Sequence, residues 1–78
     1  MNLTYKDNKN KEFSVKGVMK FSFIYPNDQL LTFPASDTKD FFDNYQDSKA
    51  IKFYTADGSS LQIDTEKIHE PKLSKSYF

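Results

Sequence analysis

Aspartate recurs through one short segment of the chain, SDTKDFFDNYQD at residues 36–47. Its four aspartates are three or four residues apart, which is the spacing of neighbours on a helix surface. They are Asp37, Asp40, Asp43 and Asp47. Rigid carboxylates at regular spacing can imitate nucleic-acid phosphates and bind a basic groove on another protein. The spacing therefore predicts a partner-binding surface, and a merely solvated helix face is the alternative.

Catalytic chemistry lacks its usual residues in this chain. Acid–base catalysis needs carboxylates in a sheltered pocket that shifts their pKa, and we expect these aspartates on the wet side of a helix. There is one histidine, His69, and no cysteine, which removes thiolate nucleophiles and thiolate metal sites. Two glycines cannot build a phosphate-binding loop. We expect no enzymatic activity, no metal site and no cofactor.

Lysines offer a second chemistry near the N-terminus. The formal net charge of the chain is zero, which argues against a globally basic nucleic-acid binder. The first quarter is nevertheless rich in lysine, and Lys16 and Lys20 alternate with apolar residues. A weak nucleic-acid-binding protein that uses these two side chains and the N-terminal lysines is one alternative function. Another is a structural protein that forms homo-oligomers through a sheet edge or through Tyr77 and Phe78.

The elements that must position these residues follow from hydrophobic periodicity. Apolar residues alternate from 13 to 25, which predicts a long strand with Phe13, Met19 and Phe21 on one buried face. Gly17 leaves a gap on that face and marks a bulge or a bend that divides the strand. Asp57-Gly58 predicts a tight hairpin with positive φ angles. The other predicted strands are residues 3–5, 29–33, 51–55 and 61–63.

The aspartate-rich segment is predicted to be a short amphipathic helix. Ser36 or Asp37 should cap its first turn by accepting a backbone N–H bond through the side chain. Phe41, Phe42 and Tyr45 fall on one side at about 100° per residue, opposite most of the aspartates. This aromatic side should lie across the sheet.

These elements predict an α+β fold: a mainly antiparallel sheet of about five strands in the order βββαββ, with one amphipathic helix packed on one face. Residues 1–71 should form a single domain and residues 72–78 a C-terminal tail. A single short helix leaves part of such a sheet uncovered, which favours a homodimer. The sequence has no signal-peptide pattern and no apolar run of membrane-spanning length, so we expect a cytoplasmic protein that does not bind a membrane.

The composition adds one resemblance. Asn, Lys, Asp, Phe, Tyr and Ile dominate a minimal domain without enzymatic equipment. In this respect the chain resembles small accessory proteins encoded by bacteriophages and mobile elements of low-GC bacteria. The resemblance implies a non-enzymatic inhibitor, acting in the host cytoplasm on a host protein that handles nucleic acid and presents a basic surface.

Overall fold

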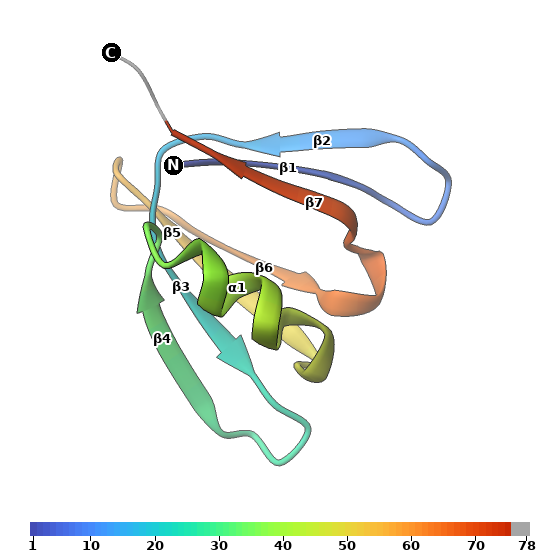
Figure 1. The fold of residues 1–78 in the computed structure, drawn as a ribbon, viewed down its shortest axis with the longest axis vertical. Helices are drawn as coiled ribbons and strands as arrows, with labels where there is room; N and C mark the ends of the chain where they lie inside the picture. The colour runs from blue at the N-terminus through green and yellow to red at the C-terminus, as the bar shows by residue number, and fades with distance from the viewer. Residues whose placement is uncertain (76–78) are drawn as a thin grey trace.

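The computed structural model describes residues 1–75 of the chain and contains, in that part, two antiparallel sheets and one short α-helix (Figure 1). The fold is therefore α+β, with seven described strands in place of the five expected. The elements are β1 (Asn2–Lys6), β2 (Glu12–Val15), β3 (Val18–Ile24), β4 (Leu30–Pro34), α1 (Thr38–Asn44), the 3₁₀ turn η1 (Tyr45–Asp47), β5 (Ala50–Thr55), β6 (Ser60–Asp64), the 3₁₀ turn η2 (Thr65–Lys67) and β7 (His69–Ser74). Tyr77 and Phe78 lie outside the described residues.

The chain passes from one sheet to the other between β2 and β3. One sheet has the strand order β4-β3-β5-β6 and the other β2-β1-β7. Gly17 joins them with a φ of +68°, a left-handed conformation that favours glycine. Its carbonyl accepts the Ala56 N–H at 2.8 Å, and its N–H donates to the Asn2 side-chain oxygen at 3.1 Å. The expected division at Gly17 is therefore a transfer from one sheet to the other.

A β-bulge shifts the parity of β3. The register against β5 slips between Val18 and Lys20, so Met19 is the extra residue. Val18 is buried as a result, whereas Met19 is 61% exposed. Phe13, in the other sheet, is 37% exposed. The prediction that Phe13 and Met19 share the buried face of Phe21 is wrong, because a bend and a bulge interrupt the simple alternation.

Strand β7 includes residues that were expected to form a tail. Residues 72–74 pair with β1, with Leu3 opposite Leu73. Pro71 is tolerated because β7 is an edge strand with a hydrogen-bonded neighbour on one side only. The pairing covers the second edge of β1, which the sequence pattern left without a partner.

Three hairpin turns have the same geometry. In each, the N–H of the fourth turn residue donates to the carbonyl of the first, at 2.8–3.1 Å. The fourth residues, Asn10, Asp28 and Gly58, have φ angles of 68°, 65° and 87°. Asp57 is not among the residues with positive φ. Its hairpin is thus a type I turn followed by one left-handed residue, rather than a tight turn with two positive φ angles.

Both sheets and α1 contribute to one aromatic core. Phe41 of α1 is fully buried, with its ring centroid 5.3 Å from that of Phe21, 5.9 Å from that of Phe23 and 6.2 Å from that of Phe53. Leu3 of β1 is also fully buried in this cluster. Figure 1 shows α1 lying across the face of the four-stranded sheet, while β1, β2 and β7 form a second layer. The expected helix-on-sheet packing is confirmed.

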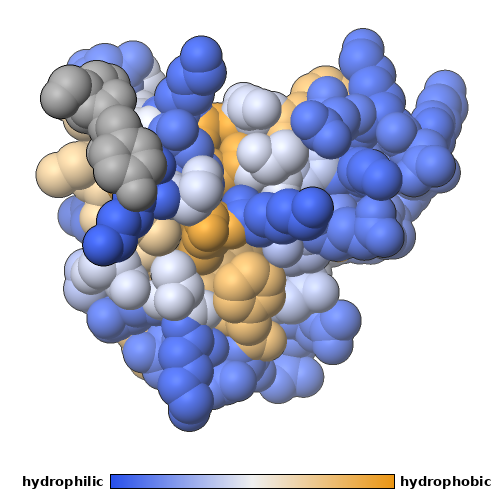
Figure 2. All heavy atoms as spheres, turned by 45° about the horizontal axis from the view of Figure 1, so that its top comes forward, coloured by the Kyte–Doolittle hydropathy of each residue, from blue (hydrophilic) through white to orange (hydrophobic). Residues whose placement is uncertain are grey.

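Hydrophobic side chains also reach the surface. Figure 2 shows them as a band in the middle of one face, between hydrophilic margins. The large hydrophobic residues that are exposed in the described chain come from five elements: Phe13, Met19, Leu30, Leu31, Phe42 and Leu61. Leu30 and Leu31 lie on β4, an edge strand. Homodimer formation through such an edge stays a prediction.

Candidate functional site

The acidic segment is held on the sheet by one aromatic side chain. Phe41 is fully buried, whereas Phe42 is 45% exposed and stacks on Phe41 with a centroid distance of 5.3 Å. Tyr45 packs partly buried against the core. The expectation that Phe42 covers the sheet is therefore only partly met. A seven-residue helix that directs Phe41 straight into the core places the next residue about 100° away, at the margin of the contact.

The helix begins without the expected side-chain cap. Asp37 occupies the N-cap position, and its carbonyl accepts the Phe41 N–H at 3.1 Å. Neither its carboxylate nor the Ser36 hydroxyl makes a capping hydrogen bond. The backbone explains this, because Asp37 has ψ near 65° instead of the extended conformation typical of a capping residue. The prediction of a side-chain cap is wrong.

The four aspartates differ in exposure but lie along one continuous segment. Asp43 and Asp47 are exposed, and Asp37 and Asp40 are partly buried. After Asn44 the chain tightens into η1, which advances about 120° per residue instead of about 100°. On these two repeats, Asp40, Asp43 and Asp47 project within about 100° of one another around the helix axis, and Asp37 precedes them at the N-cap position. The surface that carries these four aspartates is hereafter called the acidic face.

Among the residues that the structure describes, one carboxylate of the acidic face has a cation beside it. Lys39 lies one helical turn before Asp43, with 3.3 Å between the ammonium nitrogen and a carboxylate oxygen. Both groups are largely exposed, so this pair contributes little to stability. Within residues 1–75, the side chains of Asp37, Asp40 and Asp47 make neither an ion pair nor a hydrogen bond. These three carboxylates are free to bind another molecule.

The two candidate lysines occupy different places. Lys16 is exposed just before Gly17, where the chain passes between the sheets. Lys20 lies on β3 and points to the face of the sheet opposite α1, because Phe21 beside it points into the core. Among the described residues, Lys16 and Lys20 do not share a contact.

Lys20 instead meets residues that the sequence pattern did not single out. Its ammonium nitrogen lies 4.7 Å from the ring centroid of Tyr54, and the ammonium of Lys52 lies 5.2 Å from the same centroid. Lys20 and Tyr54 are register partners across β3 and β5. The alternation of Lys52, Phe53 and Tyr54 in the sequence predicted that Lys52 and Tyr54 lie on the same face of their strand. Their proximity to Lys20 depends on a strand pairing that no local pattern encodes.

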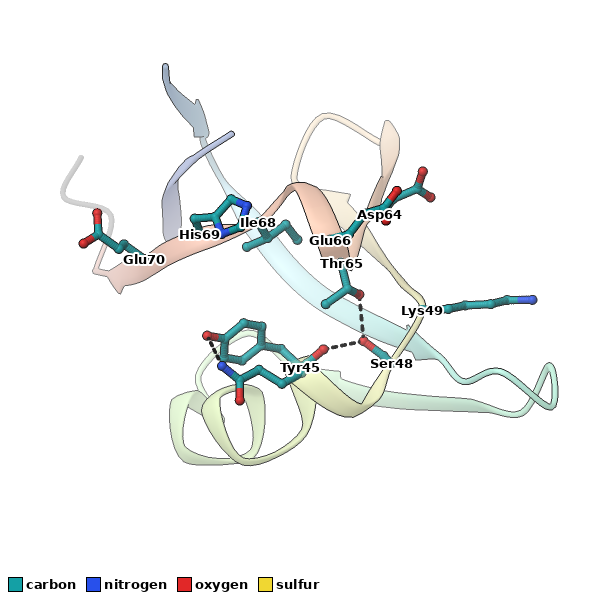
Figure 3. A pocket seen from close by; sticks show the side chains of 10 residues that line it. Tyr45, Ser48, Lys49, Asp64, Thr65, Glu66, Ile68, His69 and Glu70 are labelled. Atoms are coloured by element: carbon teal, nitrogen blue, oxygen red, sulfur yellow. Dashed lines mark hydrogen bonds between the residues drawn. The ribbon is translucent and has the colours of Figure 1, made fainter. Parts of the chain in front are cut away.

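A shallow groove of about 800 Å³ separates η1 from η2 and the start of β7 (Figure 3). Tyr45 and Ser48 lie on one side, with Thr65 and His69 on the other (Figure 3). The Ser48 hydroxyl donates to the Tyr45 carbonyl at 2.7 Å and lies 3.0 Å from the Thr65 hydroxyl oxygen. His69 contacts the side-chain oxygen of Asn8. The Ser48 and Thr65 hydroxyls are thus paired with each other, and His69 is paired with a residue outside the groove rather than with either hydroxyl.

No group of three histidine or acidic residues in the described part of the chain could hold a metal ion. The helical segments among residues 1–75 are too short or too polar to cross a membrane.

Comparisons with known protein families, with curated proteins and with solved structures find no match to the chain.

Proposed function

We propose that this protein is a small non-enzymatic protein-binding module whose acidic face binds a basic surface on a partner protein. The residues assigned to this contact are Asp37, Asp40, Asp43 and Asp47. The observation that carries the proposal is that three of these four carboxylates have no partner within residues 1–75. The fold leaves them unused.

The local energetics support a role outside folding. At Asp40 and Asp43, the two aspartates within α1, aspartate costs about a few tenths of a kcal/mol per position relative to glutamate, because it is a poorer helix former. Asp47 also follows the C-terminal end of α1, where the helix dipole disfavours negative charge. Solubility alone does not require this choice, because glutamate would supply the same charge at a smaller cost. A binding surface explains the preference for short, rigid carboxylates.

The partner that fits this surface is a protein with a nucleic-acid-binding groove. A strip of carboxylates on a helix can take the place of backbone phosphates, and its attraction to a basic groove falls with salt. Occupying the groove would exclude the nucleic acid. The protein would then act as a nucleic-acid mimic that inhibits a host protein, in keeping with the resemblance to phage and mobile-element accessory proteins.

The test is an affinity pull-down from the lysate of a low-GC Gram-positive bacterium, with wild type and the Asp40→Asn/Asp43→Asn/Asp47→Asn variant side by side. The matched control is Glu12→Gln/Asp64→Asn/Glu66→Gln, which removes three exposed charges elsewhere. Circular dichroism first establishes that all proteins fold.

We expect a nucleic-acid-binding protein to be retained by wild type and by the control variant but lost with the helix variant. Raising the salt concentration should release it. Retention of the same proteins by all three, or of no protein by any, would reduce the acidic face to a solvated helix surface.

A further inference from the structure

The outer face of the four-stranded sheet is opposite the acidic face. On β3 and β5 the inward residues include Phe21, Phe23 and Phe53, which are fully buried and contact α1. Strand alternation directs the intervening residues outward. The register aligns them in rows across the four strands: Pro34, Lys20, Tyr54 and Ser60 in one row, and Thr32, Ser22, Lys52 and Gln62 in the next.

These rows form a mainly polar surface with one aromatic ring, that of Tyr54. Ser22 is buried, and its hydroxyl bonds to that of Thr32 at 2.7 Å. Ser60 and Gln62 are exposed on the edge strand β6. Tyr54 is partly exposed and is the aromatic residue of these two rows. The Tyr54 ring offers a face on which a planar group can stack when the lysine ammoniums that lie over it move aside.

Both cations of this surface are associated with the ring and not with an acid. The ammonium nitrogens of Lys20 and Lys52 lie 4.7 Å and 5.2 Å from the Tyr54 centroid. Within residues 1–75 neither lysine has a carboxylate within ion-pairing distance. Each ammonium can therefore move from the ring to a phosphate when another planar group takes its place. Asp64 of β6 also belongs to the outward-facing residues, but it lies opposite Ala50 in a separate row.

We propose that Tyr54, Lys20 and Lys52 form a binding site for single-stranded RNA on the outer face of the sheet. An unpaired base stacks on the Tyr54 ring, and the two lysines bind the phosphates on either side. Ser60 and Gln62, next to the ring and to Lys52, supply hydroxyl and amide groups for the ribose 2′-hydroxyl, the group that separates RNA from DNA. Duplexes bind poorly because their bases are stacked internally.

This site is independent of the proposed protein-binding function, because it uses the opposite face and different residues. The combination describes a protein with an acidic face and a basic aromatic face on the two sides of one sheet. Loss of one activity by a variant should leave the other intact, which makes the failure of either proposal distinguishable.

The test is a fluorescence-anisotropy titration with a labelled 15-nucleotide oligouridine at low salt, using the full chain. Tyr54→Leu should weaken binding by about 5-fold to 150-fold, the loss expected for one stacked base. Tyr54→Phe keeps the ring and should bind within about twofold of wild type. Lys20→Gln/Lys52→Gln should lower the slope of log affinity against log salt by about 1.4, as expected for two lost phosphate contacts on a single strand.

The matched control is Lys67→Gln/Lys72→Gln, which removes two exposed charges from other elements and should bind nearly as wild type does. Equal weakening by this control would overturn the site in favour of general attraction to a polyanion. No binding to the oligouridine by wild type at low salt would overturn it as well. Equal affinity for oligodeoxyuridine would overturn the assignment to RNA, and equal affinity for an RNA duplex would overturn base stacking.

Discussion

Asp57 and Asp47 are both exposed aspartates, yet the fold uses them differently. The Asp57 carboxylate accepts the Thr55 hydroxyl at 2.5 Å and the Ser59 N–H at 2.9 Å, and these bonds lower its pKa to about 2. Asp47, in η1, makes no hydrogen bond or ion pair within the described residues. One carboxylate holds a hairpin in place, whereas the other is available to a partner.

The same contrast holds for the other turns. Asp7 accepts the N–H groups of Lys11 and Lys9, both at 2.9 Å, which lowers its pKa. The pKa of Asp28 is lowered by the Lys49 ammonium, 2.6 Å away. Turn aspartates are therefore structural residues and most helix aspartates are not. Since both sets contain exposed and partly buried aspartates, exposure does not distinguish them, and only their bonded partners separate a structural acid from a candidate binding acid.

The largest expected effect tests what holds the helix in place. Because Phe41 is buried among core rings, Phe41→Ala should lower the free energy of unfolding by about 3–5 kcal/mol. Phe42→Ala, at the half-exposed neighbour, should lower it by no more than about 1 kcal/mol. Urea denaturation followed by circular dichroism measures both. If Phe41→Ala leaves no folded protein, Phe41→Leu should show a smaller loss of the same sign, and equal losses at the two positions would contradict the single anchor.

A second experiment compares a turn aspartate with a helix aspartate. Asp57→Ala removes the acceptor of two hydrogen bonds and should lower the midpoint of thermal unfolding. Asp47→Ala removes a charge from an unfavourable position near the end of α1, so the midpoint should stay the same or rise. The free energy of unfolding should change by no more than about 0.5 kcal/mol. Scanning calorimetry of the two variants and wild type measures this. A larger loss for Asp47→Ala would show that the acidic face is structural.

The smallest expected effect concerns acid pH. The ordinary pKa of Asp57 is 3.8, and the folded protein lowers it to about 2. A group whose pKa is lower in the folded state contributes stability above its unfolded pKa, and this contribution is lost as the pH falls from about 4 to about 2. NMR titration of the side-chain carboxyl signals should show this pKa. Thr55→Val removes the hydroxyl donor and should raise it, and an unchanged value would contradict the role of that hydrogen bond.

Local patterns predicted much of this architecture. Residues 51–55 and 61–63 alternate and are strands, the turn formers between them make a hairpin, and the aspartate-rich segment contains the helix. Gly17 divides the long ribbon as expected. These features depend on neighbours in sequence: the strand period, the left-handed preference of glycine and the helical repeat all act over a few residues.

The candidate sites were predicted less completely. The sequence located all four aspartates but could not show which carboxylates the fold would engage. It identified Lys20 but missed Tyr54 and Lys52, because their proximity comes from the cross-strand register of β3 and β5. Lys16 and Lys20 looked equivalent in sequence, yet the bend at Gly17 and the bulge at Met19 place them in different surroundings.

The sequence by itself thus determined the α+β class, the positions of the turns and the segment that carries the acidic face. Tertiary structure alone decided the pairing of β7 with β1, the burial of Phe41 but not Phe42, and the grouping of two lysines around one tyrosine. The physical reason is the distance along the sequence over which each effect acts. Backbone preferences are set by adjacent residues, whereas register, sheet partners and side-chain burial are set when distant segments compete for one core.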